Sequence, residues 1–327
     1  MKIFVTGGTG FTGSHLTRRL LLGGHKVMVL DNQPGRYYEE LIKLGAEIHI
    51  GSVADRDLVF KLTEGCEIVH HVAAMFRRVN LSKSIYWDVN VEGTRYVFEA
   101  ALKYGVRKVV NCSTCGVHGH IHNTPASEDA PIAPEDYYQY TKYEGEKIIP
   151  EFLDKGLKVV TLRPTAIYGP GDPERFAMLY REVKKGRFYM FGSGESHYHP
   201  LFVDNLVDAF EVAAASDKEY GEVYLIADEQ YSTLNNLVTK IGEALGVDLK
   251  IHHMPFWPLW TAAFACEMVY KPFNIDPPLF RRRVDWFRQN RAFSIEKAKK
   301  EIGYKPLVGL EEGLKRTGEW YEVEGLI

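Results

Sequence analysis

The stretch KIFVTGGTGFTGSHLTRRLL, Lys2–Leu21, decides the fold of this chain. Its start, Ile3-Phe4-Val5, has the β-branched and aromatic side chains of a short buried strand. Glycines follow at once, and Ser14–Leu21 then carries leucines at helical spacing. A strand, a glycine turn and a helix together form a phosphate site for a dinucleotide, because glycines let the backbone approach the pyrophosphate and the helix start offers free N–H groups. The cofactor-binding residues predicted here are Gly7, Gly10, Phe11, Thr12 and Gly13.

Composition narrows the class of protein. The chain has 327 residues, a formal charge of −3 and 25% charged residues, which argues against nucleic acid as a partner. No apolar run reaches the roughly 18–20 residues of a membrane-spanning helix, and a strand that begins at residue 2 leaves no room for a signal peptide. Four cysteines in a chain of this length predict no disulfide framework. We therefore expect a cytoplasmic protein.

Strand and helix patterns alternate along the first half of the chain. Strands are predicted at Lys26–Leu30, Glu47–Ile50, Glu67–Val72 and Lys108–Cys112, and helices at Asp55–Leu62, Asn90–Gly105 and Tyr138–Leu153. This alternation predicts an α/β fold with a doubly wound parallel sheet, the Rossmann arrangement, and a smaller C-terminal substrate lobe. We predict a dinucleotide-binding domain of residues 1–165 and 203–227, and a substrate lobe of residues 166–202 and 228–327.

Asp31 ends the second predicted strand about 20 residues after the glycines, where dinucleotide folds place the ribose ligand. A carboxylate there accepts hydrogen bonds from both ribose hydroxyls and repels a 2′-phosphate, which favours NAD over NADP. Arg36 is near enough in sequence to reach a 2′-phosphate, and the segment DNQPG also suits a simple turn.

A hydroxyl-rich strand end and a Tyr-x-x-x-Lys pattern mark the predicted catalytic site. Ser113 and Thr114 follow the strand Lys108–Cys112, and Tyr138 and Lys142 lie in a later predicted helix. Residues four apart share one helix face, and an ammonium close to a phenol lowers the phenol pKa from about 10. Such a phenol can transfer a proton near neutral pH, while a neighbouring hydroxyl holds the substrate oxygen.

These motifs, taken in order, resemble the extended short-chain dehydrogenases/reductases, in the NAD-dependent epimerase/dehydratase branch. The matching segments are TGGTGFTG at Thr6–Gly13, Asp31, HHVAA at His70–Ala74, NVEGT at Asn90–Thr94, CSTCGVHG at Cys112–Gly119, YQYTK at Tyr138–Lys142, RPTAIYGPGD at Arg163–Asp172, FVDNLVDAF at Phe202–Phe210 and EIGYKP at Glu301–Pro306. The resemblance spans nearly the whole chain.

The resemblance implies roles for individual residues. Tyr138 would be the catalytic acid and base, Lys142 its activator and a ribose ligand, and Thr114 the hydroxyl that holds the substrate. Asn90 resembles the asparagine that anchors the lysine through a water. Ser52 stands where the family usually has an aspartate near the adenine. Further positions expected to bind NAD are Asn32, Ser52, Val53, Ala73, Ala74, Asn90, Ser113 and Pro164, together with Tyr138 and Lys142.

Departures from the family pattern bear on the substrate. Cys115-Gly116 replaces the Asp-Glu pair of the 4,6-dehydratases, and Ala166 replaces an asparagine usual in enzymes of nucleotide sugars. The segment His197–Phe202 lacks the arginine that often holds a diphosphate. The tail, with PPLFRRRVDWF at Pro277–Phe287 and FWPLWTAAFACEMVY at Phe256–Tyr270, resembles the 3β-hydroxysteroid and 4-carboxysterol dehydrogenases.

We therefore expect an NAD-dependent oxidoreductase that transfers a hydride at a secondary alcohol or ketone carbon of an apolar, steroid-like or lipid-like substrate. A nucleotide-sugar 4-epimerase that uses the same Thr114, Tyr138 and Lys142 is the first alternative, and a non-catalytic NAD-sensing protein is the second. Cys115, Ala166 and Arg282 are the predicted substrate contacts.

Three further features allow two interpretations each. The run Arg281–Arg283 suits an anion-binding group or a solvated helix face. The apolar stretch Phe256–Tyr270 suits peripheral membrane contact or a greasy substrate, and equally a core or dimer helix. Cys112-x-x-Cys115 with nearby histidines resembles a metal cluster, but three residues along a strand place the two thiols on opposite faces. We predict no metal, and we expect a homodimer.

Overall fold

The computed structural model describes residues 1–76, 81–172, 175–216, 220–273, 275 and 277–327. Seven parallel strands form one sheet in the order β11-β6-β5-β4-β1-β2-β3. Their bounds are β1 Lys2–Thr6, β2 Lys26–Asp31, β3 Glu47–Ile50, β4 Ile68–His71, β5 Lys108–Cys112, β6 Val159–Pro164 and β11 Val223–Ile226. The winding reverses between β1 and β4, the point at which open α/β sheets bind ligands beyond the carboxyl ends of their strands. The predicted doubly wound parallel sheet is confirmed.

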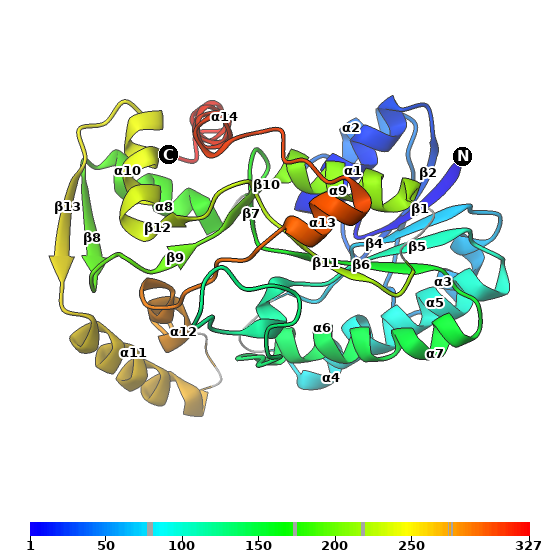
Figure 1. The fold of residues 1–327 in the computed structure, drawn as a ribbon, viewed down its shortest axis with the longest axis horizontal. Helices are drawn as coiled ribbons and strands as arrows, with labels where there is room; N and C mark the ends of the chain where they lie inside the picture. Colours follow the sequence, from blue (N-terminus) through cyan, green and yellow to red (C-terminus); the bar gives the residue numbers. More distant parts are fainter. Residues whose placement is uncertain (77–80, 173–174, 217–219, 274, 276) are drawn as a thin grey trace.

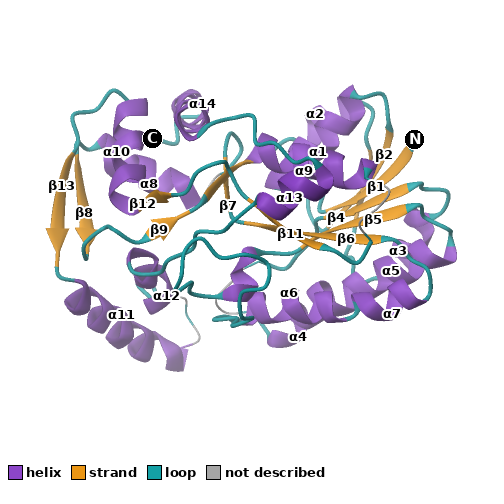
Figure 2. Ribbon diagram, in the orientation of Figure 1, coloured by secondary structure: helices purple, strands orange, loops and turns teal. Residues whose placement is uncertain are grey.

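Helices cover both faces of this sheet (Figures 1 and 2). Ile3 and Val5 of β1 are buried on one face and Phe4 on the other, because successive strand residues point to opposite sides. The first face packs on α1 (Phe11–Leu22), α9 (Val203–Ala215) and α13 (Glu296–Ile302), and the second on α3 (Arg56–Thr63), α5 (Gly93–Lys103) and α7 (Ile149–Asp154). Both faces of the sheet are therefore buried beneath helices.

The smaller lobe stands beside the carboxyl end of the sheet and has its own core. Its strands pair two by two, β7 (Ala166–Tyr168) with β10 (Pro200–Phe202), β8 (Arg187–Phe191) with β13 (Lys250–Met254), and β9 (His197–Tyr198) with β12 (Ser232–Thr233). Its helices are α8 (Arg175–Lys184), α10 (Leu234–Ala244), α11 (Phe256–Tyr270), α12 (Arg281–Val284) and α14 (Leu310–Val323). Tyr168, Tyr180 and Tyr321 are fully buried in this core.

Several predicted helices change at their ends. The helix after the glycines starts at Phe11 rather than Ser14, with Gly10 as its N-cap. The helix predicted to reach Leu153 is two helices, α6 (Tyr137–Lys147) and α7, because Pro150 has no N–H to continue the ladder. The helix expected to begin at Asn90 is α5, which begins at Gly93. Asn90 lies in a π-helical turn, η1 (Asp88–Glu92), which follows α4 (Lys83–Trp87).

The predicted domain boundaries remain predictions. One segment assigned to the smaller lobe packs elsewhere, because Ile295, Ala298, Ile302 and Tyr304 belong to the core beneath the large sheet. Within the described ranges, no helix is both long and apolar enough to cross a membrane.

Candidate active site

The glycine loop after β1 fits tightly between its neighbours. Gly7 has a φ of +70°, and a Cβ built there would lie 2.8 Å from the Cα of Ala73 at the end of β4. A Cβ on Gly13 would lie 1.9 Å from the carbonyl oxygen of Gly7. Only glycine fits at either position, so the loop brings its backbone to the crevice between β1 and β4.

The start of α1 is suited to hold a phosphate. Gly10 caps the helix without a side chain, and the first turn contains no acidic residue. The first N–H groups of a helix have no partner within it, and together with the helix dipole they attract anions. The loop therefore fits the pyrophosphate of a dinucleotide.

Asp31 ends β2, as predicted, and its side chain lies against this loop. Its Oδ2 accepts hydrogen bonds from the N–H of Thr9 at 2.9 Å and of Gly10 at 3.2 Å. Arg36 is engaged elsewhere, because its Nη1 lies 2.5 Å from the Glu324 carboxylate and its guanidinium stacks 5.0 Å above the Trp320 ring. Trp320 of α14 and Glu324, which follows that helix, thus hold the guanidinium of Arg36, the cation considered above for a 2′-phosphate.

The other predicted cofactor residues lie at the same edge of the sheet. They follow β2 (Asn32), β3 (Ser52, Val53), β4 (Ala73, Ala74) and β5 (Ser113), or end β6 (Pro164). Val53 differs from the rest, because its side chain is buried against Gly93 and contributes to the core. The Ser52 hydroxyl accepts the Ala54 N–H at 3.1 Å.

Two hydroxyls at this edge have no partner among the described residues. Ser113 Oγ, just after β5, and Thr165 Oγ1, just after β6, are buried without a hydrogen bond. Buried polar groups are nearly always satisfied, so an unpaired pair on adjacent strand ends points to a polar ligand. This observation fits the nicotinamide half of NAD. Thr165 was not among the predicted site residues, although it lies between the predicted Pro164 and Ala166.

Asn90 on η1 holds the chain that follows β4. Its Oδ1 accepts the Met75 N–H at 2.8 Å, and its Nδ2 donates to Met75 O at 3.1 Å and to Thr141 Oγ1 at 2.9 Å. Thr141 Oγ1 in turn donates to the Tyr138 carbonyl at 3.0 Å. Asn90 therefore ties the cofactor loop to the helix that carries Tyr138, and its side chain makes no direct bond to Lys142.

A directed chain of hydrogen bonds runs beneath the same loop. Thr94 Oγ1 donates to Asn90 O at 2.8 Å, so it accepts from His71 Nε2 at 3.0 Å. His71 Nδ1 must then accept from Thr6 Oγ1 at 2.7 Å, and Thr6 Oγ1 accepts the Ala73 N–H at 3.2 Å. Burial, helped by the nearby Lys142 charge, lowers the pKa of His71 to about 3, which keeps the imidazole neutral. Every link in the chain therefore has one possible direction.

Tyr138 and Lys142 lie one turn apart on α6 and both are buried. Asp136 caps this helix by accepting the Gln139 N–H at 2.8 Å. Burial lowers the pKa of the Lys142 ammonium, against the opposing influence of Cys112 and Glu146. The Tyr138 ring meets Phe76 edge to face, with centroids 5.0 Å apart.

Thr114 caps the short helix η2 (Cys115–His118), next to α6. Its Oγ1 accepts the Gly116 N–H at 3.1 Å, and the residue is partly buried. The geometry leaves the hydroxyl proton of Thr114 available to a substrate oxygen. The predicted Thr114, Tyr138 and Lys142 thus come from two adjacent elements at the carboxyl end of the sheet.

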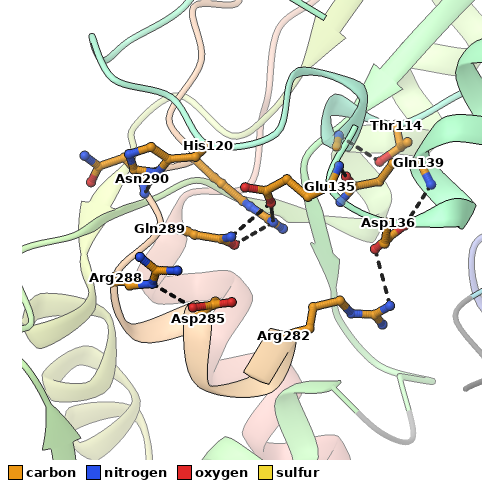
Figure 3. Close-up of polar contacts among 12 residues, drawn as sticks. Thr114, His120, Glu135, Asp136, Gln139, Arg282, Asp285, Arg288, Gln289 and Asn290 are labelled. Carbon is orange, nitrogen blue, oxygen red and sulfur yellow. Dashed lines mark hydrogen bonds and ion pairs between the residues drawn. The ribbon is translucent and has the colours of Figure 1, made fainter. Parts of the chain in front are cut away.

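A cleft of about 320 Å³ opens beside Tyr138, between α6 and the smaller lobe. Its walls are mostly apolar, and its charged residues are two cations, Lys83 and Arg282, and two carboxylates, Asp136 and Glu267. Figure 3 shows Arg282 reaching from α12 toward Asp136, with an ion-pair distance of 3.3 Å. The lining residues are Leu81, Lys83, Tyr86, Asp136, Tyr137, Tyr138, Glu267, Pro277, Phe280 and Arg282.

The three consecutive arginines of α12 have different surroundings. Arg281 pairs with Glu267 at 2.8 Å and stacks on the Trp260 and Phe264 rings. Arg283 donates to the Pro278 carbonyl at 3.4 Å. Of the three, Arg282 alone is among the residues that line the cleft. The run is therefore not one anion-binding group.

A second polar cluster fastens the segment after α12 to the chain that leads into α6 (Figure 3). Glu135 accepts from Gln289 at 2.9 Å and from Arg291 at 3.0 Å, and His120 Nδ1 accepts the Asn290 N–H at 3.1 Å. These contacts join the segment after α12 to the chain that leads into α6, on one side of the cleft.

Cys115 and Ala166, the other predicted substrate contacts, are not among the residues that line the cleft. Cys115 packs with Ile121 and Phe293, whereas Cys112 faces the core of the large sheet. The two thiols thus lie in different clusters, as predicted, but the expected reason is wrong, because β5 ends at Cys112 and Cys115 begins the helix η2. Among the described residues, no group of three His, Cys, Asp or Glu side chains is arranged to hold a metal ion.

Comparison with known proteins adds the family. The model of the NAD dependent epimerase/dehydratase family matches residues 3–227. Sterol-4-alpha-carboxylate 3-dehydrogenase, decarboxylating, of Mus musculus is 30% identical, covering 97% of this chain and 90% of the relative. The 2-alkyl-3-oxoalkanoate reductase of Stenotrophomonas maltophilia is also 30% identical, covering 97% and 98%. The structure of Thermotoga maritima UDP-glucose 4-epimerase with UDP-glucose superposes with a TM-score of 0.80 at 28% identity, covering 99% of both chains.

Proposed function

The chain belongs to the NAD-dependent epimerase/dehydratase family of enzymes, and from that premise we propose that it oxidises or reduces a secondary alcohol or ketone carbon on an apolar, steroid-like or lipid-like substrate. The observation that carries the proposal is the cleft beside Tyr138, whose walls are largely apolar and which Arg282 lines. We further propose that this arginine receives a carboxylate of the substrate.

The chemistry follows from the side chains that converge on α6. NAD, when bound, supplies the hydride acceptor at its nicotinamide. In alcohol oxidation the Tyr138 phenolate takes the hydroxyl proton, and Thr114 donates a hydrogen bond to the same oxygen. The Lys142 ammonium favours the phenolate because opposite charges at short range stabilise each other. In the reverse direction Tyr138 gives the proton back to the carbonyl oxygen.

Two relatives support a carboxylate close to the reacting carbon. The names sterol-4-alpha-carboxylate 3-dehydrogenase and 2-alkyl-3-oxoalkanoate reductase both place the reacting oxygen on carbon 3 and a carboxylate on the carbon beside it. A guanidinium is the side chain best suited to bind a carboxylate through paired hydrogen bonds. Arg282 faces the cleft that contains Tyr138, so one substrate can reach both groups.

The rival proposal is a UDP-sugar 4-epimerase, supported by the likeness to the Thermotoga maritima enzyme. A diphosphate in a pocket needs several charge-assisted hydrogen bonds. In the segment His197–Phe202, where an arginine was sought, His199 is buried between Asp228 O and the Phe293 N–H. Burial lowers the pKa of His199 to about 4, so it carries no charge for a phosphate. This environment favours the apolar substrate.

NAD is the cofactor we propose in preference to NADP, because Asp31 lies beside the phosphate loop and Arg36 is paired with Glu324. The family assignment argues against the non-catalytic, NAD-sensing alternative. So do Tyr138 and Lys142, which are buried on one helix face. A homodimer and a cytoplasmic location are retained as proposals, and sedimentation velocity tests the first.

The test compares substrates and a matched pair of arginine variants. Purified enzyme is given NAD with an apolar 3-hydroxy acid, with the same alcohol lacking the carboxylate, and with UDP-glucose. We expect NADH to form fastest with the hydroxy acid. Arg282→Gln should raise the KM for the acid by roughly 10–100-fold, the worth of a charge-assisted hydrogen bond, and should leave the KM for the plain alcohol nearly unchanged.

Arg288→Gln is the control, because Arg288 lies close by, pairs with Asp285 at 2.6 Å and does not line the cleft. It should keep the wild-type KM for both substrates. Interconversion of UDP-glucose and UDP-galactose without net NADH, and no turnover of the hydroxy acid, would establish the epimerase instead.

A further inference from the structure

The helix α11, Phe256–Tyr270, turns an uncharged face to solvent. Its only fully buried side chain is Ala263. Trp257, Phe264 and Met268 lie 7 and 4 residues apart on one face, and Trp257 is 63% exposed. Between Phe256 and Tyr270 the one ionisable carboxylate, Glu267, points inward to Arg281.

The helix is apolar on its inner side as well, at Leu259, Trp260 and Ala263, so it differs from an ordinary surface helix, which buries its apolar side and shows charges to water. Figure 1 shows α11 at the outer edge of the smaller lobe, beyond β13 and beside α12. The apolar surface continues past the helix through Phe273 and Ile275, both more than half exposed. Large apolar side chains that are exposed together on one element are typical of a docking site.

The same region is cationic. Residues 250–291 contain seven Lys and Arg against three Asp and Glu, in a chain whose overall formal charge is −3. Lys271, which begins η3 (Lys271–Phe273) directly after the helix, is exposed, and so is Arg283. Neither has an ion-pair partner among the described residues. An apolar face beside exposed cations complements a surface that is apolar inside and anionic outside.

A second copy of the chain is a poorer match for this surface. In a two-fold dimer the same patch meets itself, so Lys271 and Arg283 would approach a surface of their own charge. The helix also has 15 residues, about 22 Å at 1.5 Å per residue, which is short of the roughly 30 Å hydrocarbon core. It can lie in a membrane interface but cannot span the membrane.

We propose that α11 docks on an anionic lipid bilayer, with Trp257, Phe264, Met268 and Val269 among the headgroups and with Lys271 and Arg283 on the lipid phosphates. The cleft beside Tyr138 is lined by Glu267 of α11 and by Phe280 and Arg282 next to it. Docking therefore places the cleft close to the bilayer surface, where an apolar substrate is concentrated. This last step rests on the proposed apolar substrate, whereas the docking itself does not.

Vesicle binding tests the docking without substrate or NAD, so its result is independent of whether the proposed reaction is correct. Full-length protein is co-sedimented with vesicles of phosphatidylcholine alone and of phosphatidylcholine with phosphatidylglycerol. We expect binding to the anionic vesicles that salt weakens. Brominated lipid should quench tryptophan fluorescence, because Trp257 enters the interface.

Two variants locate the contact. The triple variant Trp257→Ser, Met268→Ser, Val269→Ser should lower the vesicle partition coefficient by about tenfold or more, and Lys271→Gln with Arg283→Gln should lower it by a similar factor on anionic vesicles. The control is Leu307→Ser with Val323→Ser, two side chains 77% and 85% exposed elsewhere on the surface. It should bind like the wild type.

Thermal unfolding of each variant establishes that it is folded. Absence of vesicle binding by the wild type overturns the proposal. So does equal loss in the control variant. A wild-type dimer that the triple variant dissociates, without any binding to vesicles, would assign the face to a second copy instead.

Discussion

The carboxyl edge of the large sheet and the helix α11 differ in opposite ways from an average protein: the first buries polar side chains, and the second exposes apolar ones. At the sheet edge polar groups are buried, and the chain from Ala73 through His71 to Asn90 pairs its donors and acceptors in a single direction. On α11 apolar groups are exposed, and only Ala263 is fully buried. The first region gains its rigidity from within, because each link fixes the next. The second is left uncovered by the described residues, and we propose that a lipid surface covers it.

This contrast predicts where change is costly. A substitution in the sheet edge disturbs groups that cannot turn to water, since an unsatisfied buried donor or acceptor costs about 1–3 kcal/mol. A substitution on the outer face of α11 disturbs groups that already face water, and such changes usually stay within about 0.5 kcal/mol.

The largest expected effect is on catalysis at the sheet edge. Tyr138→Phe keeps the ring, and with it the contact to Phe76, but removes the phenolic proton. Turnover should fall by about 10²–10⁴-fold, while the Kd for NAD measured by calorimetry stays within a few-fold of the wild type. Turnover close to normal would show that the tyrosine has been given the wrong role.

The next effect is the pH dependence of stability. Burial lowers the pKa of His70 and His71 to about 3 and of His199 to about 4, from 6.5 in the unfolded chain. The unfolded state then binds more protons, so the free energy of unfolding should fall as pH drops from 6.5 toward 4, by up to about 1.4 kcal/mol per pH unit for each histidine. Urea unfolding at stepped pH measures this slope.

The control for that slope is His252→Gln, which removes an exposed histidine on β13. It should leave the pH dependence unaltered, whereas His199→Gln should make it shallower. Identical slopes for all three proteins would mean that the buried histidines do not govern acid sensitivity.

A smaller effect tests the directed hydrogen-bond chain against α11. Thr94→Val removes the hydroxyl between His71 and Asn90 and should lower the free energy of unfolding by about 1–3 kcal/mol. Thr94→Ser keeps the hydroxyl and should cost clearly less. Met268→Ser on α11 should change it by no more than about 0.5 kcal/mol. Chemical denaturation measures the free energy of unfolding of the three variants. Equal losses of this free energy would show that the two regions do not differ in their sensitivity to substitution.

The smallest effect concerns the cofactor. NAD should bind at least several-fold more tightly than NADP, because Asp31 repels a 2′-phosphate and Arg36 is held by Glu324 and Trp320. Glu324→Gln frees Arg36 and should narrow the ratio of the two Kd values. Tighter binding of NADP by the wild type would contradict the assignment.

The sequence by itself determined the elements whose signals are local. The β-branched run and the glycines after it placed β1 and its loop, and the strand Lys108–Cys112 has the bounds that its pattern indicated. The spacing of Tyr138 and Lys142 was enough to place them on one face of α6, because helical periodicity depends only on neighbours along the chain. The separation of Cys112 from Cys115 was expected from strand alternation, but Cys115 lies on η2, so the packing of that helix decides it.

Only the tertiary structure decided which side chains meet across long separations. The three adjacent arginines have different surroundings, because Arg281 pairs with Glu267 and Arg282 pairs with Asp136. Arg36 is paired with Glu324, which is 288 positions away, and no local pattern encodes such a contact. The unpaired hydroxyl of Thr165 and the exposed face of α11 are likewise properties of packing, because what a side chain touches depends on which elements arrive beside it and not on its own neighbours in sequence.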